Sequence, residues 1–237
     1  MSGIVKLRRC SSGLIDVATV QWAPAGQALG TEAKWHLLAG LVLVEAAVWT
    51  PVAVRIAAVL GLVALAVMTL RADGAQSEAV DVEPVGFAWL FGAIGVAAVA
   101  IGWAYLRGVL HPAFGSGTKL WFYPGYVLWA MFQEVLLQGI FLVAIERWVG
   151  TKRAMWLAAA VFAVAHVPNV FLMVATFAGG LIFTKVFVAT RNYVVTGAVH
   201  AVLGLALAVT APAVWTHGML VGLSYVQGHA WTGATVR

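Results

Sequence analysis

Three ionisable side chains lie inside apolar segments of the chain, where a charge is costly. Glu134, His166 and His200 each interrupt a different run of Ala, Val, Leu and Phe. A carboxylate and an imidazole held together can activate a water molecule as a general base, and a second imidazole can donate a hydrogen bond to a developing oxyanion. These residue types therefore predict a hydrolytic site, provided that the three segments are helices that converge in one bundle.

Polar amides accompany these residues. Gln138 comes four residues after Glu134, so both side chains would share one face of a helix, whereas Gln133 is turned away by about 100°. Asn169 follows His166 by three residues and has two roles open to it, as an amide donor in the site or as the N-cap of the next helix. Because it comes directly after a proline, the N-cap is the favoured interpretation.

Each ionisable residue also has a purely structural interpretation. A single buried histidine is more often a hydrogen-bonded packing residue than a catalyst, and a buried glutamate can be its partner. One glutamate and two histidines can also bind a metal such as zinc. Three such residues in otherwise apolar helices favour a functional site over packing alone.

The composition indicates that these segments cross a membrane. Hydrophobic residues make up 62% of the 237 residues and charged residues 10%, against about 25% charged in soluble domains. The mean hydropathy is +0.94. These values exclude a soluble enzyme, a disordered chain, a collagen-like fibre and a disulfide-stapled secreted module. A single cysteine, Cys10, cannot form an intramolecular disulfide, and the scattered basic residues predict no nucleic-acid partner.

The predicted fold is all-α, a polytopic transmembrane helical bundle of about seven spans. Only Thr50-Pro51 separates the first two spans, so one tilted span over 35–70 stays open as an alternative. An N-terminal segment, 1–34, precedes the membrane domain 35–214, and a C-terminal tail, 215–237, follows it. The predicted spans are 35–49, 52–70, 86–107, 124–147, 154–166, 170–189 and 194–214.

The distribution of Lys and Arg predicts the orientation. With seven spans, the N-terminus, the loop 71–85, the turn 148–153 and Arg191 share one side, which collects most of the basic residues. The positive-inside rule places that side in the cytoplasm. We therefore expect an integral protein of the cell inner (plasma) membrane with a cytoplasmic N-terminus.

The order of the polar residues resembles that of a known family. The CAAX-protease and bacteriocin-processing (CPBP or Abi) proteins are intramembrane endopeptidases built as multi-span helical bundles. They carry the motifs Glu-Glu-x-x-x-Arg, Phe-x-x-x-His and His-x-x-x-Asn on successive helices. The similarity covers about residues 120–214, and the ordered set is more specific than any one motif. The matching residues are Gln133-Glu134-x-x-x-Gln138, Phe162-x-x-x-His166 and His200-x-x-x-Gly204.

The resemblance implies a role for each of these positions. In the family, the first Glu and the His of the second motif activate a water, and the His and Asn of the third motif stabilise the oxyanion. Here Gln133 replaces the first Glu and cannot act as a base, and Gln138 replaces the Arg, so a charged partner is missing. Gly204 replaces the Asn, and the loss of such an oxyanion donor can cost about a hundredfold in rate. Glu134 could take over as the base after a small rotation of its helix, and Asn169 could supply a replacement amide.

The expected function is that of a CPBP-type intramembrane endopeptidase that cleaves a membrane-associated peptide or protein in the lipid bilayer. Its predicted catalytic residues are Glu134 and His166, which activate water, and His200, which stabilises the oxyanion. Because the family mechanism needs only an activated water, no cofactor is predicted, and zinc is not supported. The supporting residues are Gln133, Gln138, Phe162, Asn169 and Gly204.

Two other function classes stay open. The three altered motif positions favour a catalytically degenerate relative that serves as a membrane scaffold or binding protein. Polar residues in spans also mark transporters and channels, but the sequence shows no repeated halves and no pairs of discontinuous helices, which argues against this class.

Overall fold

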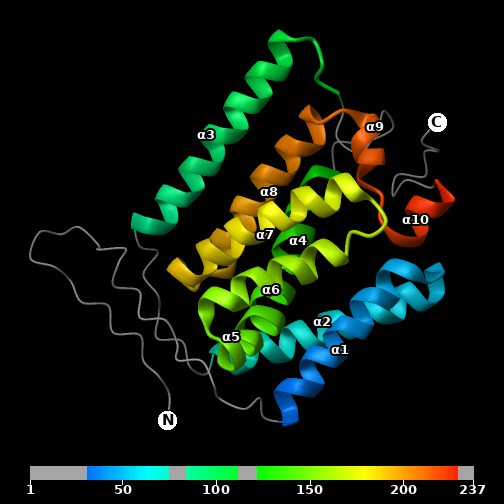
Figure 1. Cartoon of the computed structure of the whole chain (residues 1–237), viewed down its shortest axis with the longest axis vertical. Coiled ribbons are helices and arrows are strands. Elements are labelled where there is room, and N and C mark those ends of the chain that lie inside the picture. Colours follow the sequence, from blue (N-terminus) through cyan, green and yellow to red (C-terminus); the bar gives the residue numbers. More distant parts are fainter. Residues whose placement is uncertain (1–30, 75–83, 112–121, 229–237) are drawn as a thin grey trace, which may run out of the picture.

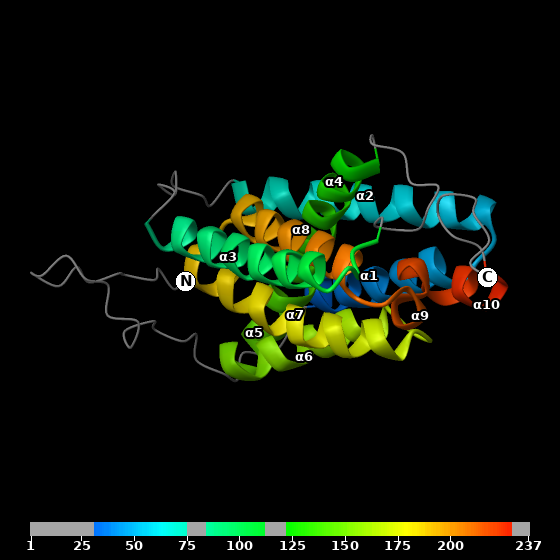
Figure 2. The ribbon, with the colours of Figure 1, turned by 90° about the horizontal axis from the view of Figure 1, so that it is seen from above.

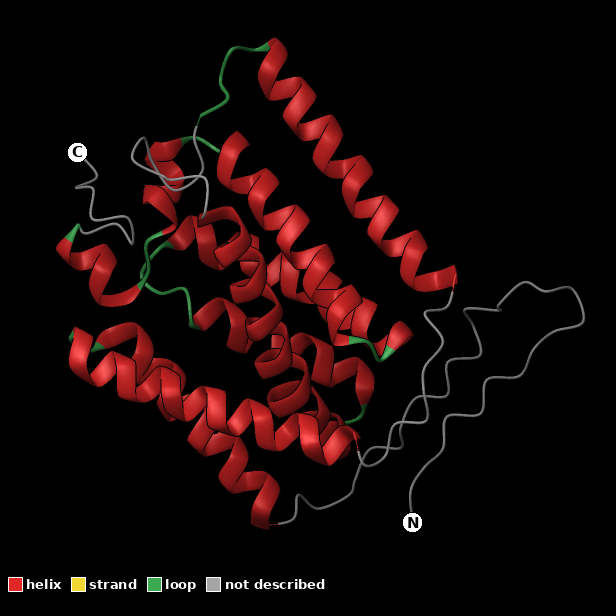
Figure 3. Ribbon diagram, turned by 180° about the vertical axis from the view of Figure 1, so that it is seen from behind, coloured by secondary structure: helices red, strands yellow, loops and turns green. Residues whose placement is uncertain are grey.

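Lipid offers no hydrogen-bond partners to the backbone, so apolar segments that cross it must form helices. The computed structural model in Figure 1 describes residues 31–74, 84–111 and 122–228. These ranges contain helices and loops but no strand, as Figure 3 shows, which confirms the predicted all-α fold. The elements are α1 (Thr31–Trp49), α2 (Val52–Gly74), α3 (Pro84–Leu106), α4 (Phe122–Glu134), η2 (Val135–Leu142), α5 (Val143–Val149), α6 (Thr151–Val164), α7 (Val170–Thr190), α8 (Tyr193–Thr210), α9 (Ala213–Thr216), η3 (His217–Met219) and α10 (Gly222–Gln227).

Each of the seven predicted spans coincides with a helix, although not every helix has the length of a span. Five units are long and apolar enough to cross a membrane, namely α2, α3, the continuous α4–η2–α5 unit, α7 and α8. The 14 residues of α6 extend about 21 Å, less than the ~30 Å of a hydrocarbon core. The predicted count of about seven is therefore approximate.

The break between the first two helices lies where the sequence places it. α1 ends at Trp49, the Thr50 hydroxyl donates to the Ala46 carbonyl, and α2 begins after Pro51. The two helices pack side by side (Figure 1). The interpretation of 35–70 as two helices is thus confirmed.

The α4–η2 segment lies at the centre of the bundle. It contacts α8 through α4, and α1, α2, α6 and α7 through η2. α3 lies beside α8 in both Figure 1 and Figure 2. Phe91, Val99 and Trp103 of α3 are largely exposed, which fits a helix that faces lipid. The central position of α4–η2 brings Glu134 within reach of its neighbours.

Glycines allow the central helices to approach closely. A Cβ atom on Gly197 of α8 would lie 2.9 Å from the Cα of Met131 in α4, and one on Gly180 of α7 would lie 3.0 Å from the Cα of Ala159 in α6. Small residues commonly mediate such helix contacts in membranes. The crossing of α4 and α8 brings the segment around Glu134 against the segment around His200.

We expect Gly197→Ala to destabilise the bundle, because the added methyl group meets backbone that cannot yield. Overpacking of this kind typically costs about 1–3 kcal/mol. The matched control is Gly95→Ala in α3, where an added Cβ has no atom within 4 Å. Thermal unfolding in detergent micelles should show a lower midpoint for Gly197→Ala alone, and equal midpoints for both variants would contradict the close approach.

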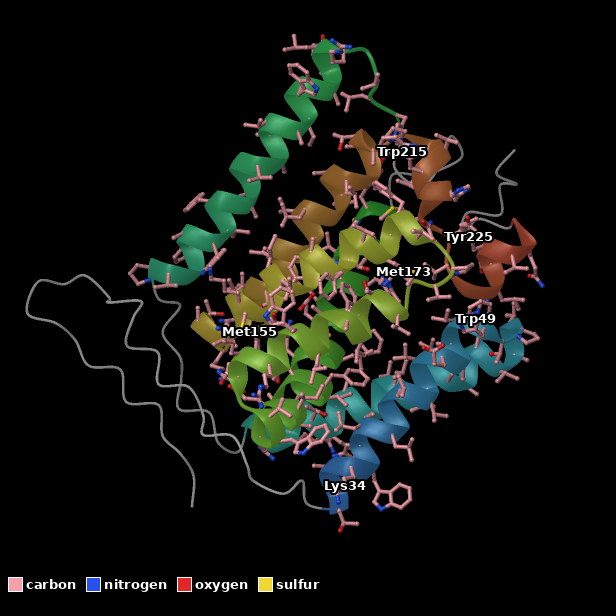
Figure 4. The ribbon with its side chains drawn as sticks, in the orientation of Figure 1. Lys34, Trp49, Met155, Met173, Trp215 and Tyr225 are labelled. Carbon is pink, nitrogen blue, oxygen red and sulfur yellow. The ribbon has the colours of Figure 1, made fainter. Side chains whose placement is uncertain are left out.

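The residues after α8 fold back onto the membrane domain as far as Gly228. Asn169 donates from Nδ2 to the carbonyls of Thr216 (2.9 Å) and Leu220 (3.1 Å). The Gly222 amide donates to the Val167 carbonyl at 2.8 Å. α10 also packs on α1, and Figure 4 shows Tyr225 of α10 close to Trp49 at the end of α1. Within the predicted tail 215–237, residues 229–237 lie outside the described ranges.

Candidate functional site

Glu134 is the last residue of α4 and is completely buried. Both of its carboxylate oxygens have a partner. Gln138 donates from Nε2 to Oε2 at 2.7 Å, and Nδ1 of His200 lies 2.7 Å from Oε1. Burial of a carboxylate is tolerated only with such partners. Glu134, Gln138 and His200 therefore form one hydrogen-bonded group between α4, η2 and α8, which we name the Glu134 group.

The helix changes its winding directly after Glu134. Residues Val135–Leu142 form a π-helix, and at its end the Val143 amide donates to the Gln138 carbonyl five residues earlier. Such wide turns occur frequently at functional sites. The prediction that Glu134 and Gln138 share a face is confirmed by their hydrogen bond, whereas nothing in the residue pattern indicated the π-helix.

Aromatic rings fix the orientation of His200. Its imidazole stacks on Phe183 of α7, with ring centroids 4.5 Å apart and planes inclined by 14°. The edge of Phe162 approaches it at 5.6 Å. Nδ1 is turned toward Glu134. Phe183 did not stand out in the sequence, because a phenylalanine in an apolar span carries no signal of its own.

His166 lies in the turn that follows α6. Its Nδ1 lies 2.7 Å from the carbonyl oxygen of Phe162, four residues earlier. A carbonyl oxygen can only accept, so Nδ1 carries the proton and Nε2 of the neutral ring keeps its lone pair. The Phe162 ring contacts His166 edge-on at 4.9 Å as well as His200. The second motif thus sets the tautomer of its histidine and places one ring between two imidazoles.

A cavity of about 830 Å³ brings the two histidines to one surface. Gln133, His166 and His200 line it, together with Phe162 and Gly204. Glu134 is not among its lining residues and reaches the cavity only through His200. Most other lining residues are apolar, and Arg55 is the only lysine, arginine, aspartate or glutamate among those described.

Asn169 serves as a helix cap. Its Oδ1 accepts a hydrogen bond from the Leu172 amide at 3.1 Å, at the start of α7. Its Nδ2 donates to the two carbonyls of the C-terminal segment. The N-cap interpretation is confirmed, and both ends of the amide are engaged outside the cavity.

The donor set of the site favours proton transfer and hydrogen bonding. No group of three or more His, Cys, Asp or Glu side chains that could hold a metal ion occurs among the described residues. The imidazole of His166 has a basic nitrogen available to a water molecule, and the imidazole of His200 is hydrogen-bonded to a buried carboxylate. Such an arrangement can combine general-base catalysis with oxyanion stabilisation.

Comparison with known proteins agrees with this geometry. Residues 115–206 match the family described as type II CAAX prenyl endopeptidase Rce1-like, a range that contains all three motifs. No curated protein and no solved structure matches the chain. With its apolar helices the protein is an integral membrane protein in a lipid bilayer. Residues 115–206 are therefore similar to the Rce1-like family of CAAX-type endopeptidases, in agreement with the resemblance of the three motifs to the CPBP proteins.

Proposed function

We propose that the protein is an intramembrane endopeptidase that hydrolyses a peptide bond of a membrane-associated peptide or protein. One observation carries the proposal: two imidazoles, one with a free basic nitrogen and one paired with a buried carboxylate, line the same largely apolar cavity. A cavity of this kind suits a substrate that carries an apolar chain next to the scissile bond.

In the proposed mechanism His166 acts as the general base. Nε2 of His166 takes a proton from a water molecule while the water oxygen attacks the carbonyl carbon of the substrate. The carbonyl oxygen becomes an oxyanion, to which Nε2–H of His200 donates a hydrogen bond. As the C–N bond breaks, the imidazolium of His166 returns the proton to the leaving nitrogen, so the enzyme regains its starting state.

The proposed role of Glu134 is to position His200 and to place a carboxylate behind its ring. Both carboxylate oxygens are engaged, and the residue is not part of the cavity surface, so this geometry favours an action on His200 over a direct action on water. Gln133 does line the cavity, and its amide can orient the attacking water without serving as a base. The mechanism uses no metal ion or organic cofactor.

The proposal includes a location. The N-terminus lies in the cytoplasm and the protein resides in the plasma membrane, because the basic residues gather on the side that holds the N-terminus. Substrates then come from proteins that are embedded in that membrane or attached to it.

The experiment that tests the function compares protein termini. Purified protein in liposomes is incubated with membrane fractions of cells that lack it, and newly formed termini are identified by mass spectrometry. Heat-denatured protein is the control. Specific new termini would support a protease and identify its substrates. If no termini appear, the degenerate alternative is favoured, since Gln133, Gln138 and Gly204 depart from the family pattern.

A further inference from the structure

The space beside position 204 is filled by a residue of another helix. A Cβ atom built on Gly204 of α8 would collide with the hydroxyl oxygen of Tyr126 in α4 and would lie 3.1 Å from its Cζ. The tyrosine hydroxyl therefore stands where the side chain of any other residue at 204 would begin. Glycine at this position is required by the close approach of Tyr126.

Tyr126 belongs to the surface of the cavity. It lines the cavity together with Gln133, His200 and Gly204. Its ring packs in a cluster with the buried Ala208 and with the partly buried Tyr123, Leu205, Val209 and Met219. The packing holds the ring on α8, and the hydroxyl meets α8 at Gly204.

The hydroxyl lies one helical turn from the proposed oxyanion donor. His200 and Gly204 are four residues apart, so they share one face of α8 at a spacing of about 6 Å along the axis. A phenol is a hydrogen-bond donor, and tyrosine hydroxyls serve as oxyanion donors in preorganised sites. A carbonyl oxygen placed in the cavity between these two residues can receive hydrogen bonds from both.

We propose that Tyr126 is a catalytic residue whose hydroxyl donates a second hydrogen bond to the oxyanion, beside His200, in place of the side chain that Gly204 lacks. The inference rests on the proposed endopeptidase function. It explains why the third motif has lost its last polar residue: the donor comes from α4, and the same hydroxyl excludes a side chain at 204. Sequence reasoning could not find it, because a tyrosine near a span end is typical of an interfacial belt.

The test measures how fast the specific termini form in liposomes, with His166→Ala as the inactive reference. Tyr126→Phe keeps the ring and its packing and removes only the donor. We expect about a 10²–10³-fold slower cleavage, the usual effect of losing one oxyanion donor. Unfolding midpoints close to wild type would show that the loss is not structural. The control is Tyr225→Phe, a tyrosine of α10 that is not among the cavity-lining residues.

A second pair of variants moves the donor back to α8. Tyr126→Leu removes the hydroxyl and shortens the side chain, which opens the space beside Gly204. The double variant Tyr126→Leu with Gly204→Asn should cleave at least tenfold faster than Tyr126→Leu alone, whereas Gly204→Asn alone should cleave slowly because it collides with Tyr126. Such a rescue would not follow from a purely structural role of Tyr126.

The outcomes separate the two proposals. If wild type and His166→Ala give the same termini, the endopeptidase function fails, and the assignment of Tyr126 fails with it. If cleavage depends on His166 but Tyr126→Phe cuts as fast as wild type, only the assignment of Tyr126 is overturned. A slow Tyr126→Phe variant that is rescued by asparagine at 204 supports both.

Discussion

Replacing His166 by alanine should abolish the cleavage that the wild-type protein performs. Of the two imidazoles among the described residues that line the cavity, the substitution removes the one whose Nδ1 is hydrogen-bonded to a backbone carbonyl, that of Phe162. This bond leaves Nε2 as the basic nitrogen. Loss of a general base typically slows a reaction by about 10²–10⁴-fold. The measurement is the rate at which specific termini form in liposomes that contain the variant.

A conservative variant separates chemistry from folding. His166→Asn keeps an amide N–H that can donate to the Phe162 carbonyl but has nothing in the place of Nε2. We expect it to be as inactive as His166→Ala while it unfolds at nearly the wild-type temperature. The control is His36→Ala, which removes an exposed histidine of α1. It should cleave as fast as wild type, because its imidazole is not part of the site. Full activity in His166→Asn would rule out the general base proposed here.

The general architecture could be predicted from the sequence because lipid leaves the backbone so few choices. Each apolar segment had to be a helix, and Pro51 favoured a break in the first run over one tilted span. The Phe162-x-x-x-His166 motif has the spacing that places the imidazole near the carbonyl one turn earlier, and the structure has this bond. These features depend on residues that are close together in the sequence, so they can be predicted from the sequence alone.

Which side chains of the central helix point into the cavity depended on tertiary packing and could not be predicted. A helix that is apolar all round has no polar face to reveal its orientation, so nothing indicated whether Gln133 or Glu134 would face the cavity. The structure turns Gln133 toward the cavity and Glu134 toward His200. The folding back of 213–228 onto α1 and α2 was hidden for the same reason. Its contacts with these helices join residues more than a hundred positions apart, such as Arg55 of α2 and Ser224 of α10.

Substitutions of Glu134 should have the second large effect. We expect Glu134→Ala to lower stability and Glu134→Gln to lower activity while the fold is kept. Glu134→Ala leaves Nδ1 of His200 and Nε2 of Gln138 without their buried partner. Breaking a buried, hydrogen-bonded pair typically costs about 3–5 kcal/mol. We therefore expect a strongly lowered unfolding midpoint for Glu134→Ala and a low yield of folded protein in detergent.

Glu134→Gln should keep the fold, because Gln138 can turn to accommodate it. Oε1 of Gln138 is buried and, among the described residues, has no hydrogen-bond partner. If the Gln138 amide flips, this oxygen can accept from the new amide at 134, while the other end of that amide still accepts from His200. The expected loss of stability is no more than about 1.5 kcal/mol, the net value of one neutral hydrogen bond.

The same variant should nevertheless cleave slowly. Without the carboxylate, the His200 ring loses the charged partner that holds its Nδ1, and the developing oxyanion loses the stabilisation that this ring passes on. We expect a rate about 10²–10³-fold below wild type, similar to the loss of an oxyanion donor. A Glu134→Gln variant that is stable and fully active would show that the buried charge serves packing alone.

A double-variant cycle decides how Glu134 acts. If Glu134 works only through His200, then adding Glu134→Gln to His200→Gln should slow cleavage no further, because residues that act as a unit are strongly non-additive. If Glu134 were itself the base that activates water, the two losses would multiply. The hydrogen bond of 2.7 Å between Glu134 and His200, together with the position of Glu134 behind the cavity surface, leads us to expect the first result.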